Sequence, residues 1–138
     1  MKIEFFNRLK TTPVNTRYDK LVEDWRVGVA RMASLVIVPK GFKFDWDSVP
    51  RIPWVYWRFK NRMKHAAALH DWLYFAGRAG IEKVTRKEAD LIMLDCMVKE
   101  GVPAYYRFII YRGVRIGGWR GWNRYRAMNP TEKEKRLL

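Results

Sequence analysis

Residues 64–77 read KHAAALHDWLYFAG, and the predicted fold is built around this segment. In a helical conformation its apolar side chains cover nearly the whole circumference, so the segment predicts a buried helix. His70 and Asp71 are the polar exceptions in its middle. A titratable pair inside an apolar helix costs several kcal/mol unless partners satisfy it, so we expect other elements to provide those partners.

A second helix is predicted over residues 85–101. Thr85 and Glu88 form the S/T-x-x-E pattern of a capping box, which begins a helix, and Gly101 stands where a left-handed residue would end it. An apolar stripe at helical spacing consists of Ala89, Ile92, Met93, Cys96 and Met97. This second helix should therefore be amphipathic.

Asp90 is the candidate partner of His70. It lies on the flank of the apolar stripe, and antiparallel packing of the two helices would bring its carboxylate to the imidazole and fix the ring tautomer. Asp71 points about 100° away from His70 around the helix, so it addresses a different neighbour. Asp45 and Asp47 could join Asp71 as hard oxygen ligands of a cation. A purely structural hydrogen-bond network is the alternative interpretation.

Upstream of these helices, the sequence predicts a small antiparallel β ribbon. Residues 19–30 and 31–39 are two β-rich runs, and residues 35–38 are the clearest strand. Residues 41–53, GFKFDWDSVPRIP, mix aromatic, acidic and proline residues, which is typical of an ordered loop that packs over other elements.

Downstream, Pro103 can open a third helix over residues 104–117. Three glycines are then expected to break the chain: Gly117, Gly118 and Gly121. The expected fold class is α+β, a mainly helical single domain of about three helices with a short N-terminal β ribbon and an ordered aromatic loop. We expect residues 1–128 to form this domain and residues 129–138 to be a flexible tail.

Length and charge narrow the class of protein. The chain of 138 residues has the size of one domain, and 28 Lys+Arg against 14 Asp+Glu give a net charge of +14, which attracts anionic partners. Cys96 is the only cysteine, so no internal disulfide can form. Neither a signal peptide nor a run of the ~20 apolar residues that span a bilayer is recognisable. We therefore expect a protein that is soluble or attached only to a membrane surface.

The segment 107–126 is basic and aromatic and contains no acidic residue. Its candidate partner-binding or phosphate-binding residues are Arg107, Arg112, Arg115, Trp119, Arg120, Trp122, Arg124 and Arg126. Guanidinium groups bind phosphate bidentately, and tryptophan anchors protein contacts or sits at a lipid interface. Three partner classes stay open: an anionic membrane surface, another protein, and nucleic acid, the last supported by charge alone.

Several motifs in register resemble a family of small phage and prophage proteins that carry a domain of unknown function. The clearest are the loop GFKFDWDSVPR (41–51), the helix AAALHDWLY (66–74) and the Ala-Asp pair at 89–90. One departure is Phe44, where that family usually has threonine. The resemblance implies a phage-encoded protein that is made in the host cytoplasm, is a candidate for incorporation into the virion, and has phage structural proteins as partners.

The arrangement His70-Asp71-x-x-Tyr74, followed by Asp90 on a second helix, is also similar to the helix pair of secretory and parvoviral phospholipases. This similarity implies that His70 is a general base to water, that Asp71 binds Ca²⁺, that Asp90 orients His70 and that Tyr74 supports the network. The glycine-rich calcium loop of those enzymes has no good counterpart in this sequence.

Three functions follow as hypotheses. The leading one is a phage accessory or virion-associated protein whose phospholipase-like centre hydrolyses an ester in the host envelope. The alternative is a non-catalytic component of the phage tail or particle that docks through its basic, tryptophan-rich surface. The third is a nucleic-acid-binding accessory protein, for which affinity should fall steeply with salt.

Overall fold

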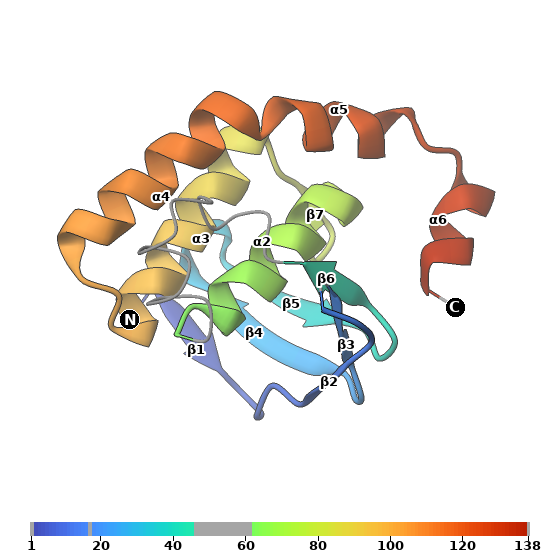
Figure 1. Ribbon diagram of the computed structural model, residues 1–138, viewed down its shortest axis with the longest axis horizontal. Coiled ribbons are helices and arrows are strands. Elements are labelled where there is room, and N and C mark those ends of the chain that lie inside the picture. The colour runs from blue at the N-terminus through green and yellow to red at the C-terminus, as the bar shows by residue number, and fades with distance from the viewer. Residues whose placement is uncertain (1, 17, 46–61, 138) are drawn as a thin grey trace.

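The computed structural model describes residues 2–16, 18–45 and 62–137. Helix α2 (Lys64–Ala76) runs through the middle of the molecule, with the strands on one side and helices α4 (Ala104–Gly117) and α5 (Trp119–Ala127) forming an arc on the other (Figure 1). The architecture is α+β with small antiparallel sheets, as predicted.

Two three-stranded sheets lie before α2. The first has the order β1-β4-β5 and the second the order β2-β3-β6, and all pairings are antiparallel. The strands of the first sheet are β1 (Ile3–Phe5), β4 (Trp25–Val29) and β5 (Ser34–Val38). Those of the second are β2 (Thr11–Pro13), β3 (Tyr18–Leu21) and β6 (Lys43–Asp45). A two-stranded hairpin follows α2 and consists of β7 (Arg78–Ala79) and β8 (Glu82–Lys83).

The predicted ribbon is the β4–β5 pair, which the short 3-10 helix η1 (Ala30–Met32) connects. Trp25, Val27 and Val29 alternate toward the core along β4, which is why this run pairs in only one register. Strands β1 and β2 were not predicted. Of the predicted loop 41–53, residues 43–45 form β6, and the part from residue 46 onward lies outside the described residues.

Five α-helices are described rather than about three. The additional ones are α5 and α6 (Pro130–Leu137), which follow α3 (Arg86–Glu100) and α4 in the chain. The expected break at the glycines is wrong because Gly118 adopts right-handed helical dihedral angles, φ −71° and ψ −17°, so the chain restarts as α5 after one residue. Asn129 caps α6 through its Oδ1 atom, which accepts the Glu132 N–H at 2.9 Å. No helix in the described ranges is long and apolar enough to cross a bilayer.

Helices α2 and α3 pack antiparallel. Glu100, at the end of α3, accepts the backbone N–H groups of His65 and Ala66 at the start of α2, at 3.1 and 2.7 Å. Asp90, near the start of α3, meets residues further along α2. The carboxylate of Glu100 thus satisfies orphan donors at the positive end of α2 and fixes the register of the helix pair.

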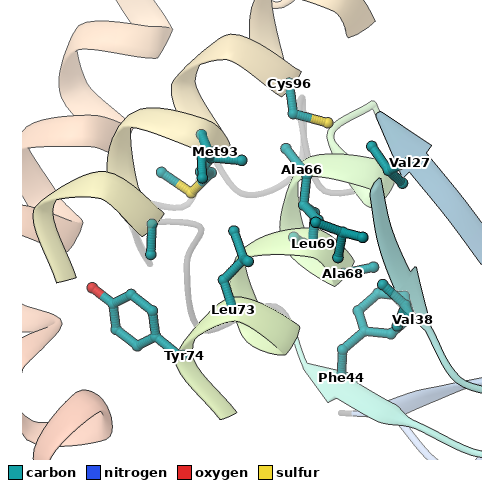
Figure 2. Packing of buried hydrophobic residues seen from close by; sticks show 14 of the residues in the cluster. Val27, Val38, Phe44, Ala66, Ala68, Leu69, Leu73, Tyr74, Met93 and Cys96 are labelled. Atoms are coloured by element: carbon teal, nitrogen blue, oxygen red, sulfur yellow. The ribbon is translucent and has the colours of Figure 1, made fainter. Parts of the chain in front are cut away.

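Helix α2 is apolar nearly all round because other elements cover it on several sides. Figure 2 shows Leu69 and Leu73 between strand residues such as Val38 and the α3 residues Met93 and Cys96. Phe44, the departure noted in the sequence, is fully buried in this cluster. The prediction that residues 64–77 form a buried helix is confirmed, since Gly77 ends α2 in the left-handed conformation.

The capping box at Thr85 gives a first testable prediction. The Thr85 hydroxyl accepts the Glu88 N–H at 3.1 Å, and Glu88 Oε1 accepts the Thr85 N–H at 3.0 Å. Thr85→Ala removes one of these bonds and should lower the free energy of unfolding by about 1 kcal/mol, measured by urea denaturation. Thr131→Ala, on the exposed surface of α6, is the control and should change it by less than ~0.5 kcal/mol.

Candidate functional site

Asp90 is the centre of a buried polar network. Its side chain has no exposed surface and accepts three hydrogen bonds: from His70 Nε2 at 2.7 Å, from the Tyr74 hydroxyl at 2.6 Å and from Arg115 at 2.7 Å. Arg86 lies 3.6 Å from the same carboxylate. The contact between His70 and Asp90 that the sequence predicted is therefore present in the structure.

Helical geometry brings these groups together. His70 and Tyr74 are one turn apart on α2, so both face the same point on α3. Arg86 precedes Asp90 by one turn on α3, and Arg115 reaches in from α4. Figure 2 shows the Tyr74 hydroxyl directed away from the aliphatic cluster and toward α3. Three helices thus converge on one carboxylate.

Two pKa values in the network move in opposite directions. Burial would raise the pKa of Asp90, but the hydrogen bonds from His70, Tyr74 and Arg115 outweigh it, and the pKa lies below its ordinary value of 3.8. Burial raises the pKa of Tyr74 well above its ordinary value, and the hydrogen bond to the Asp90 carboxylate raises it further. At neutral pH the network therefore contains an ionised carboxylate and a protonated phenol that donates to it.

The lowered pKa of Asp90 predicts acid sensitivity. The ionised carboxylate stabilises the folded state above its ordinary pKa of 3.8, and this contribution is lost as the pH falls through the lowered value, by up to ~1.4 kcal/mol per pH unit. The difference in free energy of unfolding between the wild-type protein and Asp90→Asn should be constant above about pH 5 and shrink below about pH 4. Denaturant titrations at several pH values measure it, and a constant difference down to about pH 2 would contradict the assignment.

An open cavity of about 410 Å³ lies beside this network. His70, Asp71 and Tyr74 contribute to it from α2, and Asp45 contributes from β6. The remaining lining residues come from α4, α5 and their junction: Gly113, Val114, Gly117, Gly118, Arg120, Gly121, Arg124 and Tyr125. His70, which is bonded to Asp90, therefore borders a space large enough for a small ligand.

Gly117, Gly118 and Gly121 of this wall were predicted as chain breaks and Gly113 as part of a helix, and their place in the lining of a cavity was not predicted from the sequence. A Cβ atom on Gly118 would lie 2.5 Å from the Tyr74 hydroxyl, so only glycine leaves that phenol room to reach Asp90. Gly113 and Gly117 lie one turn apart on α4, and Gly121 follows after a further four residues on α5. That spacing was the sequence signal for the wall. Arg86, one turn before Asp90, was a second signal that went unused.

Asp71 points to a different neighbour from His70, as predicted. Its Oδ2 atom accepts the backbone N–H of Asp45 at 2.9 Å, and both residues make further interactions. Asp47 lies outside the described residues. Within the described part of the chain, no group of three or more His, Cys, Asp or Glu side chains is arranged to hold a metal ion. Asp45 and Asp71 alone supply fewer oxygens than the roughly six to eight that Ca²⁺ takes.

Part of the basic segment 107–126 is engaged inside the protein. Arg107 donates to the Val102 carbonyl at 2.6 Å, and Arg115 donates to Asp90. Arg126 donates to the carbonyl groups of Tyr74 and Phe75 at 2.6 and 2.8 Å, which caps the end of α2. Arg115 and Arg126 thus join helices, and Arg107 ties α4 to the segment that precedes it.

The other members of the segment differ in position. Trp122 packs edge-on against Tyr74, with ring centroids 5.3 Å apart, and lies under the guanidinium of Arg126. Arg120 and Arg124 line the cavity. Arg112 and Trp119 are exposed on the outer side of α4 and α5. The structure therefore divides the predicted surface into a structural part, a cavity wall and an outer face.

Comparison with known proteins places the chain in a family. No curated protein and no solved structure matches it. Residues 20–114 match the family described as protein of unknown function (DUF1353). This range contains strands β4, β5 and β6, the helix pair α2–α3 and most of α4. Since this match spans more than half of the chain, the protein belongs to the DUF1353 family.

Proposed function

We propose that the cavity beside His70 is the active site of a hydrolase that cleaves an ester by general-base catalysis. The observation that carries the proposal is the 2.7 Å contact between His70 Nε2 and the buried Asp90 carboxylate at the wall of a 410 Å³ cavity. Because Asp90 accepts the hydrogen on Nε2, the neutral His70 ring is held in the tautomer that carries its proton on Nε2. The lone pair on Nδ1 is then the one that can accept a proton. This is the arrangement of a histidine base oriented by an acid.

The proposed reaction uses water as the nucleophile. His70 takes a proton from water as the water oxygen bonds to the ester carbonyl carbon, and the resulting imidazolium is stabilised by Asp90. Breaking the carbon–oxygen bond then releases the alcohol, which takes the proton from His70. Arg120, which lines the same cavity, supplies positive charge for the oxyanion.

The resemblance to phospholipase helix pairs supports the same chemistry. There, too, a histidine, the adjacent aspartate and a tyrosine one turn later share a helix opposite a second aspartate. His70, Asp71, Tyr74 and Asp90 hold these positions, and both His70 and Tyr74 contact Asp90. Together with the resemblance to phage proteins, this supports a phage accessory or virion-associated enzyme that acts on an ester of the host envelope.

The test is release of carboxylic acid from lipid esters. Purified protein is incubated with phosphatidylglycerol vesicles, with Ca²⁺ or with a chelator, and released fatty acid is quantified by mass spectrometry. Release of fatty acid by the folded protein, but not by heat-denatured protein, supports the proposal. If Ca²⁺ increases the release and Asp71→Asn abolishes that increase, a cation is assigned to Asp71. Absence of release in both conditions would overturn it.

A second candidate function, attachment to an anionic lipid surface, is favoured by the outer face of α4 and α5. Four large apolar side chains are exposed there at helical spacing: Tyr105, Phe108, Ile116 and Trp119. They lie among arginines in a segment without acidic residues, a pattern that binds anionic interfaces. The fraction of protein that sediments with phosphatidylglycerol vesicles should fall in Ile116→Asp and stay unchanged in Ile81→Asp, which alters an even more exposed isoleucine elsewhere. Equal sedimentation of both variants would contradict it.

A further inference from the structure

A second cavity of about 280 Å³ adjoins the one at His70. The two share Asp45, Asp71, Arg124 and Tyr125 in their linings, so they lie side by side along a common wall. The second cavity lies at the small end of the range for ligand pockets, which suits one charged group rather than a whole ligand.

Three cationic side chains from three elements line this second cavity: Lys43 of β6, Arg124 of α5 and Arg136 of α6. None of them forms an ion pair with an acidic side chain of the described ranges. Both guanidinium groups lie near the Tyr125 ring, at 5.1 Å for Arg124 and 5.7 Å for Arg136. Two like charges gathered on one ring repel each other, and an anion between them would relieve that repulsion.

The acidic residues of the wall, Asp45 and Asp71, are fewer than the cationic ones. Asp71 already accepts the Asp45 backbone N–H and makes a further interaction, as does Asp45. Across the two cavities, these two carboxylates face four cationic side chains: Lys43, Arg120, Arg124 and Arg136. The joined space therefore keeps a positive excess that selects an anionic ligand.

Helix α6 is held in place by a hydrogen bond to the end of α2. Lys133 donates to the Phe75 carbonyl at 3.0 Å, next to the bonds that Arg126 makes to the end of α2. Burial lowers the pKa of Arg126, and burial together with the charge of Arg126 lowers the pKa of Lys133. The docked α6 then carries Arg136 to the cavity, so residues 130–137 complete its lining.

We propose that Lys43, Arg124 and Arg136 form a phosphate-binding subsite for the substrate of the His70 cavity. Guanidinium groups match phosphate oxygens bidentately, and a lysine adds a point charge, so this set favours phosphate. The inference rests on the proposed hydrolase in one respect only, namely that the bound phosphate ester presents its cleavable bond to His70. Its substrate class is thus an ester that carries a phosphate group, either in a lipid headgroup or in a small soluble molecule.

Binding is measured by calorimetry with inorganic phosphate and with glycerol phosphate, without turnover. Saturable binding is expected for the wild-type protein, with Kd at least tenfold weaker in Arg124→Gln and in Arg136→Gln. Arg112→Gln is the matched control, because Arg112 also lies over an aromatic ring, Phe108, at 5.4 Å, but does not line either cavity, and its Kd should equal that of the wild type. Both cavity arginines are exposed, and circular dichroism verifies that each variant keeps its helices.

Two further measurements separate phosphate binding from hydrolysis and a lipid ligand from a soluble one. His70→Gln should bind phosphate normally, so failure of the hydrolase proposal would leave this binding intact. Phosphatidylglycerol vesicles that compete with glycerol phosphate in the wild type, but not in Arg136→Gln, would identify a lipid headgroup as the source, and absence of competition would identify a soluble ester. Absence of phosphate binding by the wild type, or an equal loss in Arg112→Gln, would overturn the subsite.

Discussion

Replacing Asp90 with alanine is expected to lower the free energy of unfolding by about 3–5 kcal/mol. The substitution removes the common acceptor of His70, Tyr74 and Arg115, all of which donate to a carboxylate with no exposed surface. The Arg115 guanidinium would be left partly buried without its counter-charge, and the Tyr74 hydroxyl without its acceptor. Urea denaturation followed by circular dichroism measures the loss.

Asp95→Ala is the matched control for this prediction. Asp95 lies on the same helix and is nearly as buried, and Arg31 holds it through two hydrogen bonds at 3.0 and 3.2 Å. Its partners Arg31 and Lys2 have side-chain exposures of 31% and 71%, whereas that of His70 at Asp90 is 4%, so water replaces the lost carboxylate of Asp95 at lower cost. We therefore expect a smaller loss in Asp95→Ala, and an equal or greater one would contradict the central role of Asp90.

Replacing His70 with glutamine is expected to lower ester turnover by about 10²–10⁴-fold while the free energy of unfolding changes by less than ~1 kcal/mol. The glutamine amide N–H can occupy the place of His70 Nε2–H and still donate to Asp90, but it cannot accept a proton from water. The loss should appear in kcat with KM unchanged, since the cavity keeps its other lining residues.

His65→Gln is the control for this second prediction. His65 is the other histidine of the chain, bonds to Glu100 through Nδ1 at 2.9 Å and does not line the cavity at His70. Its replacement should leave turnover unchanged even where it costs some stability. A loss of several kcal/mol in His70→Gln, without an effect specific to turnover, would instead favour the interpretation of His70, Asp71 and Asp90 as a purely structural network.

Local patterns were sufficient for the two central helices. The apolar circumference of residues 64–77 predicted α2, and the capping box at Thr85 predicted the start of α3. Both patterns are formed by residues close together in the chain, so they can be recognised in the sequence. The position of Asp90 one turn into α3 was sufficient to predict its contact with His70. Strands β1 and β2 were missed since each has only three residues, too few for a periodic pattern.

Side-chain periodicity along single helices was enough to predict the buried helix α2, the amphipathic helix α3 and the pairing of His70 with Asp90. Contacts between elements far apart in the chain bring Arg115 to Asp90, form one wall of the cavity from glycines of two helices, and place Arg124 and Arg136 at Tyr125. Those positions depend on how α4, α5 and α6 dock onto α2 and α3. That docking uses arginine and lysine bonds to helix-end carbonyl groups, which leave no periodic signal in the chain.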